Sequence, residues 1–253
     1  MIRFISSQGH HQAVEQGKLM IESFAKAVPN QTLHLYTEDF IKVKVELGNK
    51  YPIEIINLKE VSDEEYTKFQ EDKHIPIPSR TKRFAHKAWA IMHSLENYNE
   101  GLLCWIDADV LFKHTMGVEW VESLVSKNEL SAHLGVEVKV NNNTHPMDGK
   151  TIYAAETGFF VINLEHKDKD KFLKEYRRSY LERDFNTLRK PFDNDIYGRT
   201  IKVIETEYRE LSPNLELVSP FNKSVLRSFM YHYKAHHKER MLKEGPQKVL
   251  NLP

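Results

Sequence analysis

Apolar and polar residues along the first part of the chain alternate in a strand, loop, helix order. Residues 2–5 predict a short strand, a polar turn follows over residues 6–9, and residues 11–27 have a helix-like pattern. Apolar residues alternate with polar ones over residues 32–36, and isoleucines recur over residues 51–58. We expect these last two segments to be strands of a sheet.

The middle of the chain contains the clearest patterns. Residues 59–78 are acidic and then proline-containing, which predicts a surface loop. Residues 79–95 carry apolar residues at helical spacing. Residues 102–106 are a continuous apolar run, typical of a central parallel strand that is covered on both faces. Further predicted elements are a helix over 118–126, strands over 130–140 and 158–164, and a helix over 167–182; the remainder shows no clean period.

This order predicts an α/β fold in which a central mixed, mostly parallel sheet is flanked by helices. Length and the absence of a composition break favour a single domain over residues 1–253. The chain is 40% hydrophobic and 28% charged, with a mean hydropathy of −0.56, which excludes a membrane-embedded protein. With no secretory signal and no transmembrane segment in the sequence, we expect a cytoplasmic protein.

Charge and cysteine content exclude some kinds of partner. Lys and Arg number 36, as do Asp and Glu, so a net charge of zero gives no long-range attraction to nucleic acid, and no nucleic-acid partner is expected. The single cysteine, Cys104, lies in the apolar run and cannot form an internal disulfide, so we expect it to be buried.

Two aspartates follow directly after the predicted central strand. Asp107 and Asp109 are two residues apart, so in extended backbone their carboxylates point the same way. Paired carboxylates suit Mg²⁺ or Mn²⁺, and open α/β sheets bind ligands outside the carboxyl ends of their strands. Asp-x-Asp is common by chance, however, and the same pair can simply cap a turn.

The run from 102 to 112, LLCWIDADVLF, resembles the Asp-x-Asp segment of GT-A glycosyltransferases. In that family the aspartates coordinate a divalent ion that bridges the two phosphates of a nucleotide sugar. The resemblance therefore implies a GT-A, Rossmann-like domain with Asp107, Ala108 and Asp109 at the donor site. It also implies that residues 1–112 form the nucleotide-sugar-binding half, and residues 113–253 the acceptor-side half with a C-terminal closing segment.

The preceding helix, SRTKRFAHKAWAIMHSL, is similar to the family helix whose basic residues face the donor. Arg80, Arg83 and Lys87 are the matching residues, and their spacing places them on one stripe of the helix. A solvated basic face would give the same pattern. In the N-terminal strand, IRFISSQGHH resembles the first nucleotide-contacting element, with Ser6 and Ser7 as contacts or, alternatively, as helix caps.

Three further carboxylates are implied on the catalytic side. AAETGFFVINL resembles a segment that supplies polar groups before a core strand, and Glu156 is its carboxylate. PFDNDIYGRTI resembles an Asp-rich element facing the sugar, with Asp193 and Asp195. Any of the three is a candidate base for an inverting reaction, and the sequence leaves retention equally open. Glu156 as a strand-end cap is the alternative interpretation.

Near the C-terminus, FMYHYKAHHKERM resembles a segment in which one imidazole completes the metal site and a lysine meets the diphosphate. His232 and Lys238 are the matching residues, although His236 and His237 are close enough to take the same role. A His-rich basic segment can also be merely exposed and solvated.

Taken together, the resemblance implies a transferase, with hexosyl transfer favoured, that moves a sugar from a nucleoside-diphosphate sugar to a glycan, lipid-linked or protein acceptor with Mn²⁺ or Mg²⁺. Two alternatives remain open. One is a haloacid-dehalogenase-type phosphohydrolase, with Asp107 as nucleophile and Asp109 as acid/base. The other is an inactive carbohydrate-binding protein of the same fold.

Overall fold

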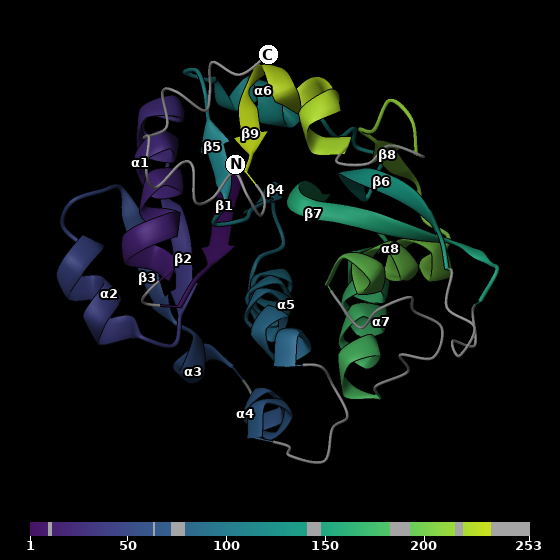
Figure 1. The fold of residues 1–253 in the computed structure, drawn as a ribbon, viewed down its shortest axis with the longest axis horizontal. Helices are drawn as coiled ribbons and strands as arrows, with labels where there is room; N and C mark the ends of the chain where they lie inside the picture. The colour runs from purple at the N-terminus through teal and green to yellow at the C-terminus, as the bar shows by residue number, and fades with distance from the viewer. Residues whose placement is uncertain are drawn as a thin grey trace.

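The protein is built around one central sheet in a computed structural model (Figure 1). The residues described are 1–9, 12–62, 64–71, 79–140, 148–182, 193–215 and 220–233. Seven strands form the sheet in the order β3-β2-β1-β4-β7-β6-β8. Their bounds are β1 Ile2–Ser7, β2 Leu33–Thr37, β3 Ile53–Asn57, β4 Leu102–Ile106, β6 Ser131–Lys139, β7 Thr151–Asn163 and β8 Tyr208–Glu210.

The sheet is mixed and mostly parallel, as the sequence predicts. Strands β3, β2, β1 and β4 are parallel neighbours. Only β7 is reversed among the seven, since it pairs antiparallel with both β4 and β6, and β8 is parallel to β6. The carboxyl end of β4 therefore meets the middle of β7, where Ile106 is paired with Phe159.

Strand β4 is covered on both faces, which explains its uninterrupted apolar sequence. Leu103 and Trp105 pack into one core layer, whereas Cys104 and Ile106 pack into the other. All four are at most 1% exposed, so the predicted burial of Cys104 is confirmed.

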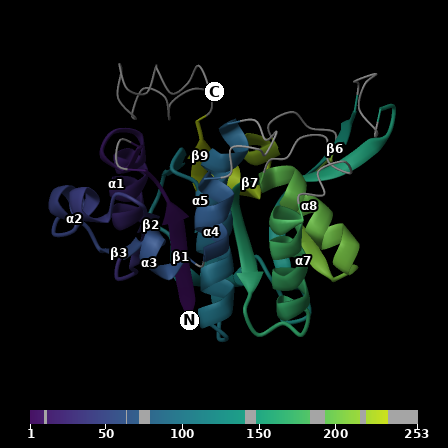
Figure 2. The same cartoon turned by 90° about the horizontal axis from the view of Figure 1, so that it is seen from below.

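Helices form the two outer layers. One layer contains α3 Leu58–Val61, α4 Glu64–Glu71, α5 Ser79–Asn97, α7 Lys169–Leu181 and α8 Asp193–Ile204. The other contains α1 Gly17–Ala27, which continues the short π-helix Gln12–Gln16, then α2 Phe40–Leu47, α6 Val118–Ser123 and the 3-10 turns Pro220–Lys223 and Val225–Ser228. In Figure 2, α5, α7 and α8 lie side by side, and each contacts the other two.

The prediction of a surface loop over residues 59–78 is wrong in its first half. Helices α3 and α4 occupy most of residues 58–71. Tyr66 and Phe69 of α4 pack against Trp89 of α5, with ring centroids 5.2 and 5.3 Å apart, and both are 2% exposed. Tertiary packing of this short apolar face stabilises a helix that the polar sequence does not predict. Helix α2 is also absent from the sequence-based prediction, and residues 72–78 lie outside the described part.

The predicted strand 158–164 is part of the longer strand β7, which begins at Thr151. Its first half pairs only with β6, and the register shifts between His133 and Leu134. Helix α8 falls in the part of the chain for which no helix is predicted, although its sequence is amphipathic, with eight of its twelve residues buried. The asparagine turn at 141–143 lies outside the described residues.

A second, two-stranded sheet pairs β5 Val110–Phe112 with β9 Met230–His232, antiparallel. This sheet brings the end of the described chain back to the residues that directly follow β4. Among the described helices, none is long and apolar enough to cross a membrane.

A buried histidine next to β8 gives a stability prediction. His133 is 0% exposed; its Nδ1 lies 2.9 Å from Ser131 Oγ, and its Nε2 lies 2.8 Å from the Tyr153 hydroxyl. Burial, reinforced by Lys202, lowers the pKa of His133 to about 3. Since the unfolded histidine has a pKa of about 6.5, the unfolded state binds the extra proton below that pH. Stability should therefore fall as the pH falls from about 6.5 toward 3.

We expect the free energy of unfolding to fall by about 2 to 3 kcal/mol between about pH 6.5 and 4.5, because His133 is protonated only in the unfolded state. Each pH unit below the unfolded pKa then costs about 1.4 kcal/mol. Urea unfolding of the wild type and of His133→Gln at both pH values measures it, because glutamine does not titrate. An identical pH dependence in the two proteins would contradict a histidine that is buried neutral.

Candidate metal centre

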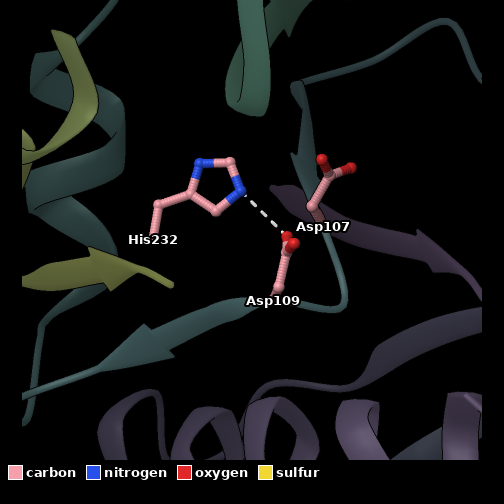
Figure 3. A group of neighbouring side chains, drawn as sticks. All are labelled: Asp107, Asp109 and His232. Atoms are coloured by element: carbon pink, nitrogen blue, oxygen red, sulfur yellow. Dashed lines mark hydrogen bonds and ion pairs between the residues drawn. The ribbon is translucent and has the colours of Figure 1, made fainter. Parts of the chain in front are cut away.

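Three potential ligands converge at the carboxyl end of β4 (Figure 3). Asp107 follows the last residue of β4. Asp109 lies in the turn to β5, and the Val110 amide closes this turn by donating a hydrogen bond to the Asp107 carbonyl. His232 is the last residue of β9 and is paired with Val110 across the small sheet. The Tyr233 amide also donates to the Asp109 carbonyl at 3.0 Å. Backbone hydrogen bonds at or beside Asp107, Asp109 and His232 therefore hold the three residues in place.

The distances between these side chains fit one divalent ion. One ligand atom from each of the three residues can be chosen such that all lie within 4.8 Å of one another. His232 Nε2 lies 2.9 Å from Asp109 Oδ1. Adjacent ligands on an octahedral Mg²⁺ are about 3 Å apart and opposite ones about 4.2 Å, so only small movements are needed. Two carboxylates and an imidazole are an acceptable donor set for Mn²⁺.

Lys87 forms the centre of a buried network behind the aspartates. Its Nζ lies 2.9 Å from Asp107 Oδ1 and 2.9 Å from Asp193 Oδ2, and it donates to the Thr157 carbonyl. The Thr157 hydroxyl donates to Asp193 Oδ2 at 2.6 Å. Lys87 is 5% exposed. The solvated basic face considered for this position is thus excluded for Lys87, which connects α5, β4, β7 and α8.

Among the described side chains, negative charge exceeds positive charge around this network. Burial raises the pKa of Asp107; the Lys87 ammonium opposes the shift, while Asp109 and Asp193 add to it. Burial alone would lower the pKa of Lys87, but Asp107 and Asp193 outweigh it and hold that pKa above its usual value. A divalent cation beside Asp107 and Asp109 would compensate the remaining charge, so the electrostatics fit the metal that the ligand geometry suggests.

Glu156 lies on the other side of His232. Its Oε1 is 3.4 Å from His232 Nδ1, longer than the usual hydrogen bond of about 3 Å. His232 is 4% exposed and lies between this carboxylate and Asp109. A carboxylate next to the second nitrogen of a histidine is the usual arrangement for orienting a metal ligand. Glu156 thus lies beside the candidate metal centre, within strand β7 rather than ahead of it.

Gly158 makes room for the His232 ring, which gives a second prediction. A Cβ at this position would lie 2.6 Å from Cε1 and 2.7 Å from Nδ1 of His232, closer than side chains pack. Gly158→Ala should displace the imidazole and weaken Mn²⁺ binding by about 10- to 100-fold, the usual cost of disturbing the surroundings of a ligand. Calorimetry without nucleotide measures this. Gly9→Ala is the matched control, since a Cβ there has no atom within 4 Å; equal affinities of the two variants would contradict the steric role.

The other predicted site residues are placed as follows. Ser6 is fully buried in β1, and Ser7 ends that strand, at the same edge of the sheet as Asp107. Ala108 is 5% exposed, and its carbonyl accepts from the Tyr233 hydroxyl at 3.3 Å. Asp195 is 0% exposed in the first turn of α8. The side chains of Arg80 and Arg83, and all of Lys238, His236 and His237, lie outside the described part.

Sequence reasoning misses two residues of the centre. The apolar run places Trp105 in the core only, yet its indole nitrogen donates to Asp107 Oδ1 at 2.6 Å. The alternation of a strand contains the signal, because residues 105 and 107 share a face. Gly158 has no such signal, since its role depends on a histidine that follows it by more than seventy residues.

Comparison with solved structures identifies the fold. Mouse xyloside xylosyltransferase 1 superimposes with a TM-score of 0.57 at 11% identity, covering 92% of this chain and 97% of that one. The galactosyltransferase LgtC, in complex with donor and acceptor sugar analogues, gives 0.55 at 11% identity over 100% and 98%. The chain has the GT-A glycosyltransferase fold. The bifunctional glycosyltransferase WbbM, with a TM-score of 0.56 at 14% identity, is covered over 50% of its length.

The GT-A fold and the sheet predicted from the sequence agree, so the α/β class with a mixed, mostly parallel sheet is confirmed. No family model matches the sequence, and no curated protein matches it. Because these structures are 11–14% identical to the chain, the likeness shows the fold alone, and the activity has to be argued from the site.

Proposed function

We propose that this protein is a metal-dependent glycosyltransferase that moves a sugar, a hexose in the first instance, from a nucleoside-diphosphate sugar to an acceptor hydroxyl. The observation that carries the proposal is the Asp107, Asp109 and His232 cluster at the carboxyl end of β4 in a GT-A fold. Ligands of open α/β sheets bind at this edge. The acceptor would be a glycan, a lipid-linked saccharide or a protein.

Asp107, Asp109 and His232 would hold Mn²⁺ or Mg²⁺, which supplies charge stabilisation for the departing nucleoside diphosphate. In this proposal Lys87, which donates to Asp107, and Glu156, whose Oε1 lies 3.4 Å from His232 Nδ1, would orient two of these ligands. The ligands come from both proposed halves, since Asp107 and Asp109 precede residue 113 and His232 follows it.

The donor nucleotide would lie over the ends of β1 and β4. Ser7 supplies the β1 contact in this proposal, because Ser6, the other predicted residue, is fully buried; Arg80, Arg83 and Lys238 are proposed as phosphate or sugar contacts. Lys87 is a predicted donor contact as well. Its ammonium already pairs with the carboxylates of Asp107 and Asp193, so in this proposal it would meet the donor only beside these two carboxylates.

Among the proposed catalytic carboxylates, Asp193 and Glu156 lie beside the metal cluster. Asp193 is held by Lys87 and Thr157, which suits binding of sugar hydroxyls by an ionised carboxylate. Glu156 is the candidate base for an inverting reaction, with orientation of His232 as its second role. Asp195 is fully enclosed, which favours a part in holding the first turn of α8 over direct contact with substrate.

The phosphohydrolase alternative has less support. It requires Asp107 to attack phosphorus, but Oδ1 of Asp107 already accepts hydrogen bonds from Lys87 and Trp105, and the fold is that of glycosyltransferases. An inactive carbohydrate-binding protein has no need of the ligand cluster, which is intact.

A single assay separates the three functions. The protein is incubated with a panel of nucleotide sugars and Mn²⁺, and release of nucleoside diphosphate is followed with and without chelator. Chelator-sensitive release supports the proposal. Hydrolysis of an aryl phosphate without such release would favour the phosphohydrolase, and sugar binding without any turnover would favour the inactive binding protein.

A further inference from the structure

The indole of Trp105 is aimed at a metal ligand from within the core. Nε1 donates to Asp107 Oδ1 at 2.6 Å, and the same oxygen accepts from Lys87 Nζ at 2.9 Å. Trp105 is 1% exposed. Its ring stacks on Phe160 with centroids 6.2 Å apart and an interplanar angle of 12°, and Lys87 Nζ lies 4.8 Å from its centroid.

We propose that Trp105 is a positioning residue that occupies Oδ1 of Asp107, so that the carboxylate presents Oδ2 alone to the divalent cation. This proposal rests on the metal site of the proposed function. Carboxylates bind cations through one oxygen or through both, and the terminal torsion of an aspartate is broad, so an unrestrained Asp107 would sample both modes. Two hydrogen-bond donors on Oδ1 restrict Asp107 to binding the cation through one oxygen.

The indole is suited to this task because it cannot move away. Trp105 lies in the central strand β4, and its ring is enclosed in the core layer under α5. A hydrogen bond to a carboxylate is shorter and stronger than one between neutral groups, which agrees with the 2.6 Å distance. Since Trp105 and Asp107 are on the same face of the strand, the backbone itself sets their separation.

The contact also makes Trp105 a reporter of the site. A cation at Oδ2 draws charge from the Asp107 carboxylate, which weakens the acceptor at Oδ1 and alters the environment of the indole N–H. Trp89, the second buried tryptophan, is 3% exposed and packs against Tyr66 and Phe69 instead.

The first test is calorimetric titration of Mn²⁺ into Trp105→Phe, with Trp89→Phe as the matched control. Both variants keep an aromatic ring in the core, but only the first removes the donor to Asp107. We expect about 10-fold or greater loss of Mn²⁺ affinity in Trp105→Phe, as for other groups that orient ligands, and wild-type affinity in Trp89→Phe. Equal affinities in wild type and Trp105→Phe would overturn the role of Trp105 while leaving the metal site in place.

The second test leaves Trp105 in place and titrates the folded wild type. The chain has three tryptophans, so its ¹⁵N spectrum contains three indole signals, and Trp89→Phe and Trp120→Phe assign the third to Trp105. Titration with diamagnetic Mg²⁺ should shift the Trp105 signal most, along a saturating curve. Mg²⁺ binding with an unmoved Trp105 signal would overturn the inference, and failure of the wild type to bind either Mg²⁺ or Mn²⁺ would overturn the metal site as well.

Discussion

Asp109→Asn is expected to lower the rate of metal-dependent sugar transfer by about a thousandfold, because a metal contributes several kcal/mol of charge stabilisation and each 1.4 kcal/mol is a factor of about ten. The asparagine would keep the shape of the side chain and one oxygen, but it lacks the charge that attracts the cation. The backbone carbonyl at this position still accepts from the Tyr233 amide, so the turn to β5 should be preserved. Release of nucleoside diphosphate, with the same donor and Mn²⁺ concentrations for both proteins, measures the rate.

Asp148→Asn is a suitable control for this experiment. Asp148 is an exposed aspartate in the turn before β7 and is not part of the ligand cluster. Its replacement should leave the rate within about twofold, as for most surface changes. An Asp109→Asn protein with wild-type activity would contradict the assignment of Asp109 as a metal ligand.

Lys87→Met should destabilise the fold by about 3 kcal/mol at neutral pH, because removing one partner of a buried ion pair leaves the other charge uncompensated. Here two carboxylates, on Asp107 and Asp193, lose their common ammonium. Urea unfolding measures the loss. Burial already raises the pKa of Asp107, and that pKa should rise further without the Lys87 ammonium. The folded state then binds more protons, so the deficit relative to wild type should shrink as the pH falls toward about 4.

Two variants show whether charge is the cause. Lys169→Met also removes a buried ammonium. Lys169 Nζ donates to the Leu95 carbonyl and to Asn99, and among the described residues its carboxylate partner is Asp170, whose side chain is 87% exposed, so we expect a smaller loss of about 1 to 2 kcal/mol. Asp193→Asn added to Lys87→Met should recover part of the stability. Equal losses at both lysines, with no recovery, would contradict the bridging role of Lys87.

Local sequence pattern predicts the helices and strands whose residues have the same kind of surroundings along the whole element. The run 102–106 is apolar throughout because β4 is covered on both faces, and this marks the strand and the edge where Asp107 lies. Asp107 and Asp109 do lie together, but the turn between β4 and β5 brings them together, and the extended backbone assumed in the prediction is wrong at these residues. The resemblance to GT-A enzymes adds His232, which local pattern does not connect to residue 107.

Elements that depend on distant partners are not predictable in the same way. Helix α4 is polar except for Tyr66 and Phe69, whose partner Trp89 comes from another helix. Helix α8 packs on β7, and its close approach depends on Gly198, where a Cβ would lie 2.8 Å from the Ala154 backbone. The position of Lys87 between Asp107 and Asp193 requires three elements to be placed first.

Calorimetric binding of a panel of nucleoside diphosphates, with and without Mn²⁺, to the wild type and Asp109→Asn tests the central claim most directly. The account predicts that at least one nucleoside diphosphate binds the wild type only when Mn²⁺ is present, and that this binding is lost in Asp109→Asn while the variant remains folded. Failure of every member of the panel to bind folded wild-type protein, or binding that is equally tight without metal and in the variant, would contradict it.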